Sequence, residues 1–191
     1  MYLSVVQVAD GEGQLENVNE IANTIRGDKD SIDAVMVIDE KGSPESIPGI
    51  HTLIREIRPP HMSVILVTSG MNPTSLDDLV GAGYVDRVAF RLEKRPCKEQ
   101  LRSMDLARAN RVDFVTAVVM DPTVVTQEDV LAIAEVTEGH DEFILLQPMA
   151  PHACYRKKDL NALSKSLKGK ARNVRVLNDV RRPSDRGRRR G

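Results

Sequence analysis

Carboxylate side chains directly follow several apolar runs of this 191-residue sequence. Asp10, Asp39 and Asp121 stand at such positions, and Thr68 and Ser69 close a further run. Carboxylates can act as acids, bases or ligand contacts, and hydroxyl groups can both donate and accept hydrogen bonds. Carboxylates after strands are more often solvated or capping groups, so the pattern identifies no catalytic residue. We treat these side chains as candidate ligand contacts.

A second candidate lies between the run that ends at Thr68 and the next predicted helix. Ser69, Gly70 and Asn72 occupy this turn, where backbone N–H groups could hold a phosphate or a carboxylate. An ordinary turn between a strand and a helix would have the same composition, and we favour that interpretation.

Sulfur is scarce in this chain. The two cysteines, Cys97 and Cys154, are far apart and have no Cys-x-x-Cys spacing, which predicts neither a disulfide framework nor a zinc site. His152 lies near Cys154, but a metal site needs a further ligand that the sequence does not indicate. We therefore predict no metal site and no resident cofactor.

Charge is unevenly distributed, although the formal net charge is only -1. Arginine dominates the last residues: Arg181, Arg182, Arg186, Arg188, Arg189 and Arg190. We expect residues 181–191 to be a disordered tail that either stays solvated or binds an acidic protein partner or RNA. Aromatic residues make up only 3% of the chain, so binding of nucleic acid by base stacking is not expected.

The elements that must position these residues follow a regular rhythm. Apolar, β-branched runs alternate with amphipathic segments, which is typical of repeated βα units around a parallel sheet. Strands are predicted at residues 2–8, 34–38, 63–68, 85–90, 114–119, 143–147 and 174–177. Residues 1–180 are expected to form one domain, as an open doubly wound sheet or an incomplete barrel, and both would place ligands at the carboxyl ends of the strands.

Helices are predicted at 15–25, stopped by Gly27, and at 50–57, with further helices capped by Thr74 and by Thr126. No apolar run is long enough to cross a membrane, and no secretory leader opens the sequence. We expect a cytoplasmic protein with no membrane partner.

Five segments resemble one family in the same order along the chain. Residues 66–73 are similar to a third strand followed by an Asp-Thr-Asn-Gly-x-Asn-Pro turn, and residues 83–90 to a fourth strand, Gly-Leu-Val-Asp-Tyr-Val-Ala-Met. Residues 114–119, with 126–129 and 133–135, resemble the fifth strand and its following helix. Residues 143–148 stand where the family has a strand ending in Leu-Gln-Gln-Phe, and residues 173–176 fit the last strand. This family is the radical S-adenosylmethionine activating enzymes of glycyl-radical proteins, especially activators of anaerobic ribonucleotide reductase. The resemblance implies a partial (βα)6-type barrel of mostly parallel strands.

The functional motifs of that family are altered here. Residues 8–14 replace the CxxxCxxC loop and contain no sulfur, and Gly42-Ser43-Pro44-Glu45 is a scrambled match to the Gly-Gly-Glu-Pro turn that reaches the methionyl amino group. The Asp-x-Lys motif appears as Arg91-Leu92-Glu93, with reversed charge. Without thiolates, an iron–sulfur cluster is not expected.

We therefore predict a non-catalytic radical-SAM-like domain that acts as a binding or regulatory subunit. Its unknown small ligand or protein partner would contact Gly42 and Ser43 together with the candidate residues named above. One alternative is an activating-type enzyme whose cluster is supplied differently, with S-adenosylmethionine still bound. Another is an enzyme of unrelated chemistry that uses Asp10, Asp39 or Asp121 with Thr68 and Ser69.

Overall fold

The structure is a computed structural model. It describes residues 3–8, 22–23, 25, 27, 32–39, 42–58, 62–137, 142–147, 155–171 and 173–178. Asp10 and the arginine tail from Arg181 to Arg190 lie outside these residues.

The described strands form one parallel sheet in which the order in space equals the order along the chain. The seven strands are β1 (Leu3–Val8), β2 (Ala34–Asp39), β3 (Ser63–Thr68), β4 (Arg87–Leu92), β5 (Asp113–Val119), β6 (Glu142–Gln147) and β7 (Val174–Asn178). Each strand pairs in parallel with the next one along the chain. A doubly wound sheet would reverse its direction of growth, so this order favours the incomplete barrel of the two predicted architectures.

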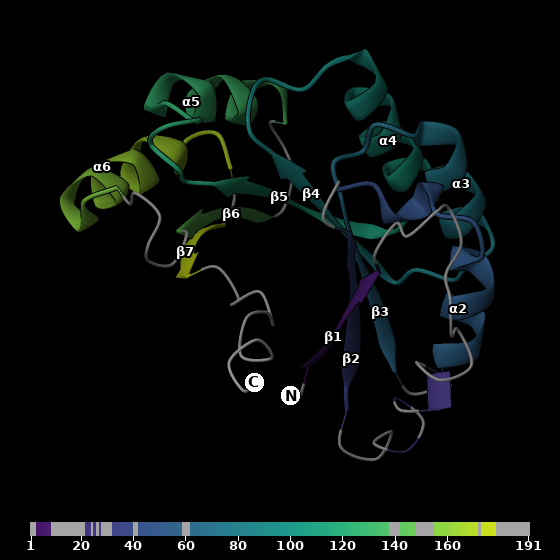
Figure 1. The fold of residues 1–191 in the computed structure, drawn as a ribbon. Coiled ribbons are helices and arrows are strands. Elements are labelled where there is room, and N and C mark those ends of the chain that lie inside the picture. The colour runs from purple at the N-terminus through teal and green to yellow at the C-terminus, as the bar shows by residue number, and fades with distance from the viewer. Residues whose placement is uncertain are drawn as a thin grey trace.

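Helices connect the strands and lie along one side of the sheet (Figure 1). They are the 3-10 helix η2 (Pro44–Ser46), α2 (Ile50–Ile57), α3 (Pro73–Gly81), α4 (Lys98–Ala109), α5 (Gln127–Val136) and α6 (Lys157–Leu167). The chain is thus an α/β fold of parallel strands alternating with helices, consistent with a partial barrel. No helix in the described part of the chain is long and apolar enough to span a membrane.

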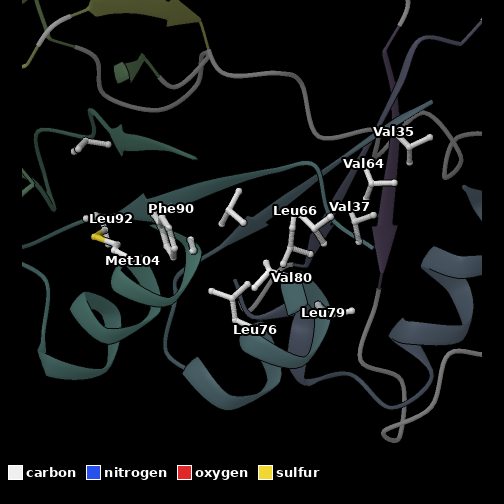
Figure 2. Packing of buried hydrophobic residues seen from close by; sticks show 14 of the residues in the cluster. Val35, Val37, Val64, Leu66, Leu76, Leu79, Val80, Phe90, Leu92 and Met104 are labelled. Carbon is white, nitrogen blue, oxygen red and sulfur yellow. The ribbon is translucent and has the colours of Figure 1, made fainter. Parts of the chain in front are cut away.

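The hydrophobic core lies between the sheet and these helices. Side chains alternate along each strand, so every second residue faces the helices. Val35, Val64 and Leu66 are fully buried on this side, and Figure 2 shows Phe90 and Leu92 beside Met104 of α4. One continuous cluster of buried apolar residues runs from Val6 of β1 to Leu167 of α6.

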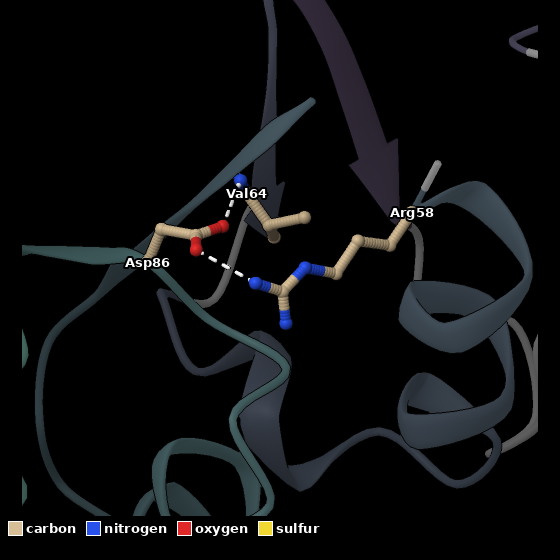
Figure 3. Close-up of polar contacts among 3 residues, drawn as sticks. All are labelled: Arg58, Val64 and Asp86. Atoms are coloured by element: carbon tan, nitrogen blue, oxygen red, sulfur yellow. Dashed lines mark hydrogen bonds and ion pairs between the residues drawn. The ribbon is translucent and has the colours of Figure 1, made fainter. Parts of the chain in front are cut away.

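The amino ends of β3 and β4 are fixed by the carboxylate of Asp86. Its Oδ1 accepts a hydrogen bond from Arg58 Nη2 at 2.7 Å, and its Oδ2 accepts one from the Val64 N–H at 2.8 Å (Figure 3). The Asp86 N–H in turn donates to the Val64 carbonyl at 3.0 Å. A single side chain therefore connects the residue after α2, the start of β3 and the segment entering β4.

Three predicted element boundaries are corrected by the structure. Strand β4 begins at Arg87 and not at Val85, because Asp86 is engaged in the contacts just described. Asn72 is the residue before α3 and Pro73 occupies its first turn, so Thr74 lies inside the helix and does not cap it. Gly27 was predicted to stop the first helix but is itself helical.

Candidate functional site

The chain reverses direction after β2 through a loop held by Asp39. The Gly42 N–H donates to the Asp39 carbonyl at 3.1 Å, and the Ser43 N–H donates to Asp39 Oδ2 at 3.3 Å. Gly42 has a φ of 78°, a conformation that side chains with a Cβ rarely adopt. Pro44 then opens helix η2, with its fixed φ suited to a first helical turn.

The loop after β3 is joined to the loop after β2 by two hydrogen bonds. The Ser69 N–H donates to the Gly42 carbonyl at 2.5 Å, and the Ser43 and Ser69 hydroxyl oxygens lie 3.0 Å apart. The two hydroxyl groups are half-buried. These loops therefore form one unit at the carboxyl ends of β2 and β3.

Beneath this unit lies a buried pair formed by Glu45 and Thr68. Glu45 is only 3% exposed and Thr68 is fully buried. The Thr68 hydroxyl donates to Glu45 Oε1 at 2.8 Å and accepts the Gly70 N–H at 2.9 Å. Thr68 thereby links the carboxyl group to the backbone of the loop after β3.

Two carboxylate oxygens at this position have no hydrogen-bond partner among the described residues. They are Asp39 Oδ1 and Glu45 Oε2, and both are buried. Burial raises the pKa of Glu45 to about 7, the hydrogen bond from Thr68 opposes this shift, and the charge of Asp39 adds to it. Near neutral pH Glu45 therefore exchanges between a form that can donate a proton and a form that only accepts hydrogen bonds.

Helix α4 holds the loop after β3 from the other side. Gln100 Nε2 donates to the Ser69 carbonyl at 2.8 Å, and the Ser103 hydroxyl donates to the Gly70 carbonyl at 2.7 Å. Gly70 has a φ of 75°, and a Cβ at this position would lie 3.0 Å from two ring carbons of Phe90. The positive φ and the close approach of Phe90 therefore both favour glycine at this position.

The structure brings most of the predicted site residues together but changes their roles. Asp39, Gly42, Ser43, Thr68, Ser69 and Gly70 share the unit described above. The N–H groups of Ser69 and Gly70, which were considered as contacts for an anion, both donate within the protein. An anion cradle at this turn would require these bonds to break.

The other candidates lie apart from this unit. Asn72 precedes α3, and its side chain makes no capping hydrogen bond. Asp121 follows β5, three strands from β2, and its Oδ1 accepts hydrogen bonds from the Thr123 N–H at 2.9 Å and the Thr123 hydroxyl at 2.6 Å. Asp121 thus stabilises its own turn.

Glu45 is the residue that sequence reasoning did not select as a ligand contact. Its only signal was its place in the scrambled Gly42-Ser43-Pro44-Glu45 turn. The carboxyl group whose pKa burial raises to about 7 is that of Glu45, which the sequence analysis did not name among the candidate carboxylates.

In the described ranges, no set of three or more His, Cys, Asp or Glu side chains is placed to hold a metal ion. Cys97 is exposed at the start of α4, with its sulfur 3.7 Å from that of Met71. His152 and Cys154 lie outside the described residues.

Asp39 and Glu45 together could offer a ligand two carboxylate oxygens.

No family model and no curated protein matches this chain. Among solved structures, it is similar to the crystal structure of a Plasmodium falciparum HPPK-DHPS variant with SDX-DHP, at 11% sequence identity and a TM-score of 0.39. The similarity covers 92% of this chain and spans 44% of the length of that one. A TM-score at this level is too low to show a shared fold.

Proposed function

We propose that this chain is a non-catalytic binding or regulatory domain with a radical-SAM-like barrel. It presents the loops after β2 and β3 to a ligand that donates hydrogen bonds. The observation that carries the proposal is the pair of buried acceptor atoms without partners, Asp39 Oδ1 and Glu45 Oε2. The similarity of segment order to the activating enzymes supports the barrel type.

A donor ligand is favoured because unpaired buried acceptors destabilise the free protein. A buried polar atom without a partner costs about 1–3 kcal/mol, which a ligand donor can recover. The site is also preorganised, since the Gly42–Ser69 and Ser103–Gly70 hydrogen bonds hold both loops in place. An amino or ammonium group suits these acceptors best because it would interact favourably with ionised Asp39 and Glu45.

The non-catalytic part of the proposal follows from donor chemistry. Reductive cleavage of a sulfonium needs an electron from an iron–sulfur cluster held by thiolates. Residues 8–14, which take the place of the cysteine loop, contain no sulfur, and Asp10 and Glu12 are hard oxygen donors unsuited to such a cluster. The Asp-x-Lys motif of the family is also replaced by Arg91-Leu92-Glu93, in which the order of the acidic and basic residues is reversed.

Calorimetry with S-adenosylmethionine and L-methionine as probes tests the binding site. We expect saturable binding to the wild type and about tenfold or more weaker binding to Glu45→Gln, which places an amide donor where an acceptor is needed. Because ammonium binding requires ionised Glu45, the wild type should release about half a proton per site at pH 7. Titrations in two buffers of different ionisation enthalpy measure that release.

The matched control is Glu93→Gln, which changes an exposed carboxylate beyond β4 and should leave binding unaltered. Equal affinity of Glu45→Gln and wild type would refute the site. Anaerobic reconstitution with iron and sulfide tests the other half of the proposal. A stoichiometric four-iron cluster that cleaves S-adenosylmethionine would refute the non-catalytic assignment.

One observation favours a second candidate function, an enzyme of unrelated chemistry. A carboxyl group with a pKa of about 7 is suited to proton transfer near neutral pH. Glu45 would then act as acid or base on a bound substrate, positioned by Thr68. Slow consumption of a bound probe, with a rate that depends on a single ionisation near pH 7 and is lost in Glu45→Gln, would select this function.

A further inference from the structure

Arg91 lies on the side of the sheet opposite to the helices. Its neighbours Phe90 and Leu92 are both buried in the core against α4 (Figure 2). Because successive side chains of a strand point to opposite faces, the Arg91 side chain points away from the core. It pairs with Ala117 of β5, and it is half-buried.

This concave side of the sheet is apolar around Arg91 but separate from the core. It includes the half-buried side chains of Met36, Ile65, Val67, Ala89, Ile144 and Leu146. None of them belongs to the buried cluster beneath the helices or packs against it. The face can therefore contribute hydrophobic contact to a bound molecule.

On the same side of the sheet as Arg91, charged side chains at the amino ends of the strands form ion pairs. Arg87 lies 3.9 Å from an oxygen of Asp113 and 4.0 Å from one of Glu142, and Arg175 lies 2.9 Å from the second oxygen of Glu142. Arg91 makes no ion pair or hydrogen bond with any described residue. It is thus a cation on an apolar surface, and the carboxylates of Asp113 and Glu142 at the amino ends of the strands are paired with other arginines.

We propose that the concave side of the sheet binds a small molecule with an anionic group on an apolar body, and that Arg91 holds the anionic group. A guanidinium group can form two parallel hydrogen bonds with a carboxylate or a phosphate, and partial burial strengthens them. The apolar side chains around Arg91 contact the hydrocarbon part.

This site is distinct from the unit formed by Asp39 and Glu45. Thr68, which binds Glu45, pairs with Phe90 and faces the helices, whereas Arg91 faces the other way. The inference does not depend on the proposed function, and Glu45→Gln should leave it intact.

Methyl-labelled protein and NMR titration with octanoate test the inference. We expect saturable shifts at Val67, Ala117 and Ile144, and about tenfold or more weaker binding to Arg91→Gln, since that variant loses the charge and the second hydrogen bond. Arg91→Lys keeps the charge without the planar fork, so its affinity should lie between those of Arg91→Gln and the wild type. Arg102→Gln, an exposed position on α4, is the matched control and should bind like the wild type.

Three further probes separate the contribution of the anionic group from that of the apolar body. Octanol lacks the charge and inorganic phosphate lacks the apolar body, so each should bind about tenfold or more weakly than its complete counterpart, octanoate or octyl phosphate. The tighter of octanoate and octyl phosphate identifies the preferred anion. Unchanged octanoate affinity in a folded Arg91→Gln, shifts confined to the helix side of the sheet, or equal binding of octanol would overturn the inference.

Discussion

Glu45 makes the loop after β2 sensitive to pH. Its carboxyl group is held against Thr68 with almost no contact with solvent, and burial is the largest cause of its raised pKa. The protonated form is therefore the one that the folded chain prefers. In the unfolded chain the same group titrates near its ordinary value of 4.5.

This difference predicts that the folded state loses stability as pH rises from about 4.5 to about 7. Between these values the native protein binds more protons than the unfolded chain, so the free energy of unfolding falls with pH and levels off above the folded pKa. The full shift corresponds to a loss of about 3 kcal/mol. Urea unfolding at pH 5 and pH 8 measures it.

Glu45→Gln should remove most of that fall, because an amide does not titrate and can still accept the hydrogen bond from Thr68. The matched variant Glu93→Gln changes an exposed carboxylate and should retain the wild-type difference between the two pH values. An unchanged pH dependence in Glu45→Gln would show that Glu45 titrates normally in the folded protein.

The proximity of the candidate residues could be predicted from the sequence, but the chemical environment of Glu45 could not. Asp39, Thr68 and Ser69 end strands, and parallel strands place their carboxyl ends at one edge, so their proximity could be predicted. Glu45 could not be selected, because its burial depends on a one-turn helix that directs it beneath a neighbouring loop. The N–H groups of Ser69 and Gly70 appeared free because their acceptors, Gly42 and Thr68, are fixed only by the tertiary fold.

Strands and helices are joined at the opposite edge of the sheet by Asp86. One of its oxygens accepts a hydrogen bond from Arg58, the residue after α2 (Figure 3). The other accepts a hydrogen bond from the N–H of Val64 at the start of β3. The ion pair is partly exposed, with 29% and 36% of the two side chains accessible. The bond to the backbone is the better protected of the two.

Asp86→Ala should therefore lower the free energy of unfolding by about 1–2 kcal/mol, mainly because the Val64 N–H loses its acceptor. Asp86→Asn keeps an acceptor oxygen and should lose only the ion-pair share, about 0.2–1 kcal/mol. Urea unfolding at pH 7 compares the two. Asp105→Ala removes a more exposed pair with Arg108 and provides the control. Equal losses in Asp86→Ala and Asp86→Asn would assign the effect to charge alone.

Element positions were predictable because each strand carries a β-branched, apolar run of the right length. The runs at 34–38, 63–68 and 114–119 agree with β2, β3 and β5 to within one residue at each end. Thr126 was also predicted correctly as a cap, since it makes a reciprocal pair of hydrogen bonds with Asp129. The start of β4 was missed because the apolar Val85 is buried without being in the strand.

The sheet grows in one direction from β1 to β7, which places the described helices on one side and leaves a concave side opposite (Figure 1). Glu142 of β6 lies at the amino end of that concave side and forms ion pairs with Arg87 of β4, two strands away, and with Arg175 of the adjacent β7. Only 15% of its side chain is exposed. It therefore connects the middle of the sheet to the β7 edge.

The continuous core predicts that the whole chain unfolds in one transition. Methyl signals of Val35 near one edge of the sheet and of Leu163 on α6 should report the same urea midpoint, because both side chains belong to one buried cluster. Glu142→Gln removes the partner of two half-exposed arginines and should lower both midpoints together, by about 0.5–2 kcal/mol in unfolding free energy. Asp105→Asn, in an exposed pair within α4, should shift neither by more than about 0.5 kcal/mol. Separate midpoints for Val35 and Leu163, or a Glu142→Gln effect confined to Leu163, would instead show that β6, α6 and β7 unfold as an independent unit.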